Sequence, residues 1–380
     1  MQKIPGQANV YFKNLNAIRF IAALLVIIQH IEQLKSNFGL PNHWSNSSIH
    51  IIGKLGVVLF FVLSGFLITF LLFKEKEVTQ TISIKDFYIR RMLRIWPLYF
   101  LIIFLAFFVL PFSDFFLIKG FGKEVVWHNI SFKLPLFILF LPNLATTFGT
   151  IPYASQTWSI GAEEQFYLVW PVLNKKISNK WVLMFAVIFF YLGLKIFLGY
   201  LPSNVYLNVF RRFWDLIPID CMAIGGLFAL VVYQNNTFTQ NIRKILFSKF
   251  VQWPVLLLTV SLIVYGVNFT YFHFEIYALL FGIILTNFAC NENRIFSMEN
   301  PVLNYLGKIS YGLYMFHPIA VVIAIRAQQK LDFFNNILLY ISAVAVSVLI
   351  AALSYEFFEK RFIKKKVKYS KVISGDNARE

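Results

Sequence analysis

The first long apolar segment of the chain carries two ionisable side chains on one helical face. It reads LNAIRFIAALLVIIQHIEQL, and Arg19 and His30 stand eleven positions apart. At about 100° per residue this spacing returns both side chains to nearly the same face, separated by about 16 Å along the axis. A guanidinium binds phosphate, and an imidazole accepts a proton near neutral pH. The spacing predicts an anion-binding end and a deeper general base. The alternatives are a snorkelling anchor for Arg19 and an ordinary interior histidine for His30.

Three further arginines cluster where a later apolar segment begins, in FYIRRMLRIWPLYF. Arg90, Arg91 and Arg94 lie at spacings of three and four residues, so they share one side of a helix. Such a cluster can hold phosphate groups through bidentate hydrogen bonds. The alternative is that these cations only anchor the segment at the membrane surface.

Two adjacent carboxylic acids enter another apolar segment, in QTWSIGAEEQFYLVWP. Ser159 and Glu163 are four residues apart and share a face, with Glu164 beside them. Ionisable groups inside a membrane segment cost about 2.5–3.5 kcal/mol each, so a pair favours a functional site. A structural pair, or a favourable position at a helix N-terminus, is the alternative for one of them.

Polar side chains also lie inside two other apolar segments. LGKISYGLYMFHPIA places Ser310, Tyr314 and His317 at i, i+4 and i+7, one polar stripe on an apolar helix. GVVLFFVLSGFLITFLL contains Ser64 and Gly65, a notch among large side chains. Hydrogen bonding between helices explains the stripe equally well, and helix packing is the simplest explanation of the notch.

The composition requires that these segments lie in a bilayer. Hydrophobic residues make up 58% of the 380 residues and charged residues 14%, with a mean hydropathy of +0.65. Soluble domains average about 45–50% apolar and about 25% charged residues. The formal charge of +17 does not indicate nucleic-acid binding, because the cations flank apolar segments. The composition predicts an integral membrane protein.

Runs of suitable length predict an all-α, polytopic transmembrane bundle of about ten spans. Most of the 35 lysines and arginines then fall on the side of both termini, which the positive-inside rule places in the cytoplasm. Residues 134–144 are too short to span and contain two prolines, which favours a re-entrant or interfacial piece. The predicted spans are 15–34, 54–73, 93–111, 159–174, 181–200, 214–233, 252–268, 272–290, 309–327 and 336–358.

Taken together, these motifs resemble the acyltransferase-3 family of bacterial membrane O-acyltransferases, which acetylate lipopolysaccharide O-antigens and other envelope glycans. The resemblance covers essentially the whole chain and rests on the Arg19–His30 spacing, FFVLSGFL, RRMLR, WSIGAEEQFYLVWP and SYGLYMFHP in order. Two departures stand out. The last helix ends SYEFFEKRF where relatives often have a proline after the glutamate. The 380 residues include no SGNH-type domain, and we expect any second transfer step to need a partner protein.

The resemblance implies a transmembrane domain over residues 1–360, followed by a basic cytoplasmic tail over 361–380. It also implies an O-acyltransferase of the bacterial cytoplasmic (inner) membrane. The enzyme would take an acyl group, commonly acetyl, from cytoplasmic acyl-CoA and pass it to a glycan hydroxyl on the far side. The expected partners are the bilayer, acyl-CoA and the glycan, without nucleic acid or a metal.

Each requirement of this reaction has a candidate residue. His30 is the expected general base, or the site of a transient acyl-histidine, and Glu163 or Glu164 is expected to orient it. Arg19, Arg91 and Arg94 are expected to bind the CoA phosphates. The expected substrate-lining residues are Ser64, Ser159, Tyr314 and His317.

A transporter or flippase for a lipid-linked sugar is the alternative from another class, because buried charges also line transport pathways. Internal pseudo-symmetry would favour it, and the sequence shows no repeat.

Overall fold

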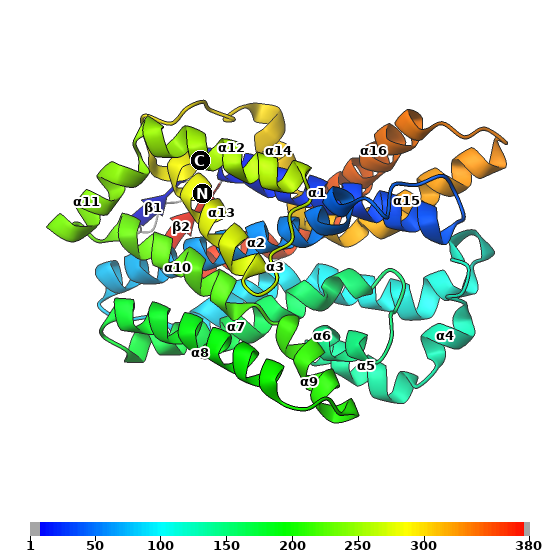
Figure 1. The fold of residues 1–380 in the computed structure, drawn as a ribbon, viewed down its shortest axis with the longest axis horizontal. Helices are drawn as coiled ribbons and strands as arrows, with labels where there is room; N and C mark the ends of the chain where they lie inside the picture. Colours follow the sequence, from blue (N-terminus) through cyan, green and yellow to red (C-terminus); the bar gives the residue numbers. More distant parts are fainter. Residues whose placement is uncertain (1–7, 376–380) are drawn as a thin grey trace.

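The computed structural model describes residues 8–375 and is built almost entirely of helices (Figure 1). Within this part of the chain, eight helical segments are long and apolar enough to cross a membrane. A ninth forms if α11 (Thr237–Leu246) and α12 (Lys249–Val264), bent by 59° at their junction, count as one span. The predicted all-α, polytopic bundle is confirmed, whereas the orientation of the termini stays a prediction.

The eight segments agree with the predicted spans and extend several of them. Some contain more than one helical element: the third joins α3 (Ile84–Phe104) to the short turns after it, the fifth joins α9 (Val205–Asp215) to α10 (Ile219–Tyr233), and the last continues α16 (Asn336–Ser354). The others are α1 (Leu15–Asn37), α2 (Ser47–Thr79), α8 (Lys180–Tyr200), α13 (His273–Cys290) and α15 (Ser310–Lys330).

The remaining predicted span is the helix α7 (Trp158–Lys176). It is 19 residues long, but two glutamates and two lysines make it more polar than the eight apolar segments. A helix of this kind is stable in a bundle only when its polar side chains face other helices rather than lipid. The polarity of α7 therefore marks the interior of the bundle.

Helices α2 and α10 cross in backbone contact, and glycine makes this possible. A Cβ atom at Gly65 would lie 1.8 Å from the carbonyl oxygen of Met222, and one at Gly225 would lie 2.0 Å from that of Val62. Small residues at such crossings are the usual way in which membrane helices approach closely. The notch predicted at Gly65 is thus a packing contact, and it fixes the position of the neighbouring Ser64.

The third span ends at Phe112, and residues 113–157 then form a series of short elements rather than a span. The chain passes through a π-helical turn (Leu105–Val109), two 3-10 turns (Leu110–Phe112 and Asp114–Phe116), α4 (Lys123–Trp127), α5 (Ile130–Ile138), α6 (Pro142–Thr147) and a further 3-10 turn (Ser155–Thr157). The segment 134–144 is split between α5 and α6, with Phe140 at φ 58° between them. It does not span, in agreement with the prediction.

The C-terminal segment returns to the bundle. A π-helical turn (Tyr355–Glu359) leads from α16 into α17 (Lys360–Lys366), which packs on α3. A 3-10 turn (Val367–Tyr369) follows, and then β2 (Val372–Ser374), which pairs in parallel with β1 (Ala8–Val10). The two strands lie side by side near the start of α1 (Figure 1). The expected tail is part of the fold as far as residue 375.

A buried ion pair lies near the C-terminal end of α1. Lys35 Nζ lies 2.5 Å from Glu32 Oε1, and both side chains are fully buried. The hydroxyl of Tyr340, on α16, donates to the same carboxylate over 2.6 Å, and so does the backbone N–H of His43. Because every charge in this group has a partner, it serves to join α1 to α16.

The backbone contact at Gly65 generates a stability prediction. We expect Gly65→Ala to lower the free energy of unfolding by about 1–3 kcal/mol or more, because its methyl group would meet a backbone carbonyl that cannot rotate away. Gly193→Ala in α8 is the matched control, since nothing lies within 4 Å of a Cβ there. Thermal unfolding in detergent measures both, and equal melting temperatures would contradict the proposed crossing.

Candidate active site

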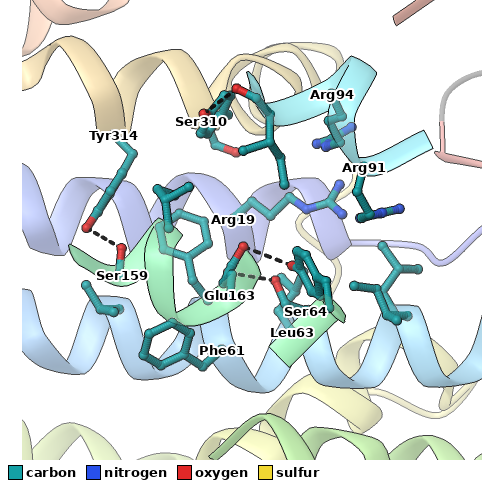
Figure 2. A pocket seen from close by; sticks show the side chains of 18 residues that line it. Arg19, Phe61, Leu63, Ser64, Arg91, Arg94, Ser159, Glu163, Ser310 and Tyr314 are labelled. Atoms are coloured by element: carbon teal, nitrogen blue, oxygen red, sulfur yellow. Dashed lines mark hydrogen bonds between the residues drawn. The ribbon is translucent and has the colours of Figure 1, made fainter. Parts of the chain in front are cut away.

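A cavity of about 90 Å³, here called the inner cavity, lies among five helices. It is lined by Arg19 of α1, Ser64 of α2, Arg91 and Arg94 of α3, Ser159 and Glu163 of α7, and Ser310 and Tyr314 of α15. In Figure 2 the three guanidinium groups lie together at one end, Ser159 and Tyr314 lie at the other, and Glu163 stands between them. The sequence motifs therefore converge on one space, with cations at one end of it.

A second space, here called the mouth cavity, adjoins the arginine end of the inner cavity. It has a volume of about 70 Å³ and shares Arg19, Leu67, Arg91 and Arg94 with the inner cavity. Arg91 lies over the rings of Phe87 and Tyr167, 5.7 and 5.6 Å from the ring centroids. Its Nε is buried and has no hydrogen-bond partner among the described residues. A buried donor without a partner is costly, so this end is suited to an anionic ligand.

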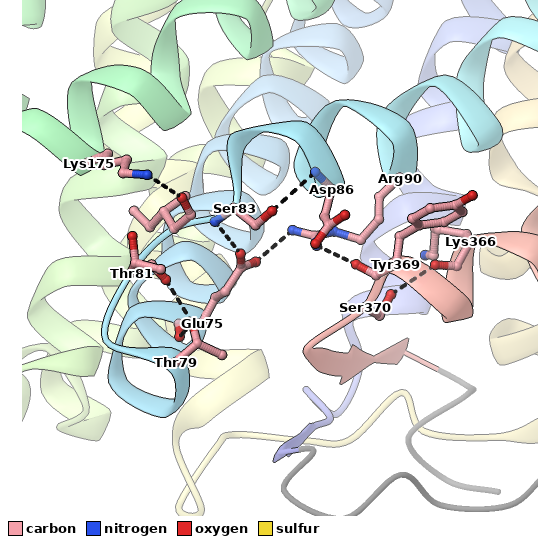
Figure 3. Close-up of polar contacts among 11 residues, drawn as sticks. Glu75, Thr79, Thr81, Ser83, Asp86, Arg90, Lys175, Lys366, Tyr369 and Ser370 are labelled. Atoms are coloured by element: carbon pink, nitrogen blue, oxygen red, sulfur yellow. Dashed lines mark hydrogen bonds and ion pairs between the residues drawn. The ribbon is translucent and has the colours of Figure 1, made fainter.

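Arg90 has a different environment, although it belongs to the same cluster in the sequence. Its Nη2 lies 2.7 Å from the carboxylate of Glu75, and its Nη1 donates to the carbonyl oxygen of Tyr369 over 2.7 Å (Figure 3). The same carboxylate accepts the backbone N–H of Ser83 over 2.8 Å. Arg90 therefore joins α2 and α3 to the C-terminal segment and lies outside the lining of the inner cavity.

The two adjacent glutamates have different neighbours. Glu163 accepts the hydroxyl of Ser64 over 3.0 Å and that of Tyr167 over 2.9 Å, and it lines the inner cavity. Glu164 accepts the indole N–H of Trp96 over 3.1 Å, and its other oxygen is buried without a partner among the described residues. Neither carboxylate has a hydrogen bond to His30 within this part of the chain, so the expected orientation of His30 by a glutamate is absent from this structure.

His30 is paired with His317 instead. The Nε2 of His317 lies 2.9 Å from Nδ1 of His30, and the Nδ1 of His317 lies 2.6 Å from the carbonyl oxygen of Tyr314. A carbonyl only accepts, so a neutral His317 is protonated on Nδ1 and accepts on Nε2. His30 must then donate from Nδ1, which also lies 3.1 Å from the carbonyl oxygen of Val26. This tautomer leaves His30 Nε2 unprotonated and able to act as a base.

Tyr314 links the histidine pair to the inner cavity. Its hydroxyl lies 2.7 Å from Ser159 Oγ and also 2.7 Å from the carbonyl oxygen of Gln156, to which it donates. Because that proton is directed at the carbonyl, Ser159 donates to Tyr314 in the shared bond. The predicted stripe of α15 is thus real, with Tyr314 at the inner cavity and His317 fully buried behind it.

His30 lines a different space, the outer cavity, of about 290 Å³. Its other lining side chains are uncharged, and they include Gln33 and Asn37 of α1 together with Tyr153 and Trp158. The inner and outer cavities share no lining residue, although the adjacent residues Trp158 and Ser159 line one each. Arg19 and His30 therefore line two separate spaces, with residues 314–317 of α15 between them.

A family model described as an acyltransferase domain matches residues 12–356. The chain belongs to the acyltransferase-3 family. The match begins before Arg19 and ends within the π-helical turn after α16, so it includes every predicted site residue.

Several curated bacterial proteins resemble this acyltransferase-3 chain. The peptidoglycan O-acetyltransferase OatA of Listeria monocytogenes is 26% identical over 94% of the chain and 57% of its own length. A protein of Bacillus subtilis that carries the same description provisionally is 27% identical, over 93% of the chain and 55% of its own length. The chain thus spans little more than half the length of these relatives. No solved structure matches it significantly.

Some residues of this acyltransferase-3 site were missed by reasoning from the sequence. Tyr167 stands four residues after Glu163 in the same motif, so helical spacing alone could have identified it. Gln156 begins that motif, and its backbone carbonyl accepts Tyr314 while its side-chain amide donates to the carbonyl oxygen of Met315 over 3.0 Å. No side-chain pattern in the sequence reveals the first of these contacts. Lys366 lines the mouth cavity from the expected tail, and its place depends on the return of the C-terminal segment.

The environment of Arg90 generates a prediction that separates it from its neighbours. We expect Arg90→Ala to increase amide hydrogen exchange in residues 367–374 by about tenfold or more, because the bond to the Tyr369 carbonyl is lost. Arg94→Ala is the control, since no hydrogen bond joins Arg94 to that segment in the described structure. Equal exchange in both variants, measured by mass spectrometry, would contradict the assignment of Arg90 to this contact.

Proposed function

We propose that this protein is a membrane O-acyltransferase. It moves an acyl group, commonly acetyl, from acyl-CoA bound at the arginine end of the inner cavity to a hydroxyl of a glycan in the outer cavity. The observation that supports this proposal most is the arrangement itself. A pair of histidines with one unprotonated nitrogen adjoins an uncharged outer cavity, and a turn of α15 connects it to an inner cavity that ends in three arginines.

The donor is inferred from the cations. The phosphate groups of acyl-CoA suit guanidinium groups in a partly dehydrated space, where charge-assisted hydrogen bonds are strong. The pantetheine arm is long and mainly uncharged, so it fits between Leu63, Ser64 and Tyr314 while the phosphates stay at the arginines. By the positive-inside rule the arginine end faces the cytoplasm, where acyl-CoA is made.

The chemical step is inferred from the tautomer of His30. His30 Nε2 takes the proton of the acceptor hydroxyl, the oxygen forms a bond to the thioester carbon, and the tetrahedral intermediate then loses the sulfur of CoA. The proton held by His30 passes to that sulfur, so atoms and charge balance. His317 is a positioning residue that holds His30 in this tautomer. Transfer requires the thioester to pass the Ser159–Tyr314 hydrogen bond, which must open during the cycle.

The acceptor is inferred from two features. The outer cavity is lined by amide, hydroxyl and aromatic side chains, which suit the hydroxyl groups and apolar faces of sugars. The relatives carry names that refer to peptidoglycan, so a glycan of the bacterial envelope is the proposed acceptor. A cytoplasmic-membrane location follows from the same proposal.

The proposed base generates the most direct activity test. We expect His30→Ala to lower transfer of labelled acetyl groups from acetyl-CoA to envelope glycan by about 10²–10⁴-fold, the usual contribution of a general base. His128→Ala is the control, because this histidine is exposed in the connection after α4. The assay uses membranes that contain equal amounts of each protein.

Wild-type acylation in the His30→Ala membranes would contradict the assignment of the base. If wild-type membranes instead moved a lipid-linked sugar without acylating it, the protein would be a transporter, and the proposed function would be wrong.

The proposed donor site generates a binding prediction. We expect Arg91→Ala and Arg94→Ala each to weaken acetyl-CoA binding by about tenfold to a hundredfold, since a hydrogen bond to a charged group contributes about 1.5–3 kcal/mol. Arg212→Ala removes an exposed arginine on α9 and serves as the control. Isothermal titration in nanodiscs measures all three. Unchanged affinity in the first two would make these arginines surface anchors only.

A further inference from the structure

We propose that Lys366 is a fourth cation of the donor site, supplied by the C-terminal segment 360–375, and that it binds a phosphate of the acyl-CoA donor. This inference rests on the proposed function, because it adds a residue to the same donor site. It assigns a binding role to a part of the chain that lies beyond the family match at residue 356.

The mouth cavity is the first observation. Four cationic side chains line it: Arg19, Arg91, Arg94 and Lys366. Its other lining residues are uncharged and come from the start of α1, from α2, and from the two strands and the residues that directly follow them. No carboxylate lines it in the described part of the chain. Four cations around a small space repel one another, so the arrangement favours a ligand that carries several negative charges. The phosphates of coenzyme A meet this requirement.

The second observation is that contacts made by the residues before and after Lys366 in the chain fix its position. Helix α17 packs on α3, the helix that carries Arg91 and Arg94. After Lys366, the carbonyl oxygen of Tyr369 accepts Arg90 and the Ser370 hydroxyl donates to the carbonyl oxygen of Lys366 over 3.2 Å (Figure 3). The strand β2 then pairs with β1. These contacts hold the lysine at the cavity instead of leaving it on a mobile tail.

The neighbouring lysines have environments that differ from that of Lys366. Lys364 and Lys365 are exposed on the same helix, and Lys360 forms an ion pair with Glu356 at 2.5 Å. Lys366 is half-buried, and its ammonium group has no hydrogen bond or ion pair with any described residue. An ammonium group that is partly withdrawn from water and surrounded by other cations gains most from a bound anion.

The test compares acetyl-CoA binding by the full chain in nanodiscs. We expect Lys366→Ala to raise the dissociation constant about tenfold and Lys366→Glu to raise it further, whereas Lys366→Arg keeps it within about threefold. Lys364→Ala is the matched control, because it removes one positive charge from the same helix at an exposed position. It should change the dissociation constant by less than about twofold. The dependence of affinity on salt should also become weaker in Lys366→Ala and Lys366→Glu, and stay unchanged in Lys364→Ala.

The outcomes separate this inference from the proposed function. If the wild type binds acetyl-CoA and Lys366→Ala binds equally well, Lys366 has no part in the site and only this inference is overturned. If the wild type binds no acetyl-CoA, the proposed donor is wrong as well. Should Lys366→Ala aggregate, Lys366→Gln, which keeps most of the stem, gives the same comparison. Unchanged hydrogen exchange of residues 367–374 in the variant shows that the loss of affinity does not come from release of the segment.

Discussion

A charge withdrawn from water inside a helix bundle is stable only with a partner, and this constraint separates the structural charges of the protein from the functional ones. Glu32 with Lys35, Glu75 with Arg90, and Glu275 with Lys195 are ion pairs at 2.5–2.9 Å, and each joins two parts of the fold or holds one end of a helix. The arginines of the inner cavity differ, because Arg91 and Arg94 have no ion pair among the described residues. Their partner is therefore sought outside the protein.

The rest of the architecture positions these cations relative to a base. A single helix, α1, carries Arg19 to the inner cavity and His30 to the outer one. The close crossing of α2 and α10 at Gly65 sets Ser64 against Glu163 of α7, so the polar helix is covered by apolar ones. Helix α15 completes the arrangement, because Tyr314 lines the inner cavity and His317 is hydrogen-bonded to His30, the proposed base at the outer cavity. Rigid helices, rather than loops, hold every one of these side chains.

The sequence was sufficient to predict much of this, since apolar length identifies spans and helical spacing identifies faces. Residues from five motifs, among them Arg19, Ser64 and Glu163, do line one cavity. Spacing does not determine how a helix is rotated against its neighbours, and for that reason the partner of His30 was mistaken for a glutamate when it is His317. For the same reason the sequence did not show that Arg90 contacts the C-terminal segment whereas Arg91 lines the inner cavity. Adjacent residues on a helix point about 100° apart, and only the rotation of the helix decides which neighbour each one meets.

The C-terminal segment shows a second limit. Its basic composition is typical of a solvated tail, and nothing local in KRFIKKKVK indicates that Lys366 returns to a cavity. That placement depends on pairing between β1 and β2, whose residues lie more than 360 positions apart in the chain. Contacts between such distant segments form only in the complete fold, so neither periodicity nor composition predicts them.

The central claim is that the donor enters at the arginines and presents its acyl group toward the histidine pair. A cryo-electron microscopy structure of the full chain in nanodiscs, with an acyl-CoA analogue that cannot transfer its acyl group, measures this directly. The account predicts phosphate density against Arg91 and Arg94 and the acyl end beyond Ser159, with the Tyr314 hydroxyl displaced from it. Density for the nucleotide in the outer cavity, or arginines that remain without a ligand at saturating analogue, would contradict it.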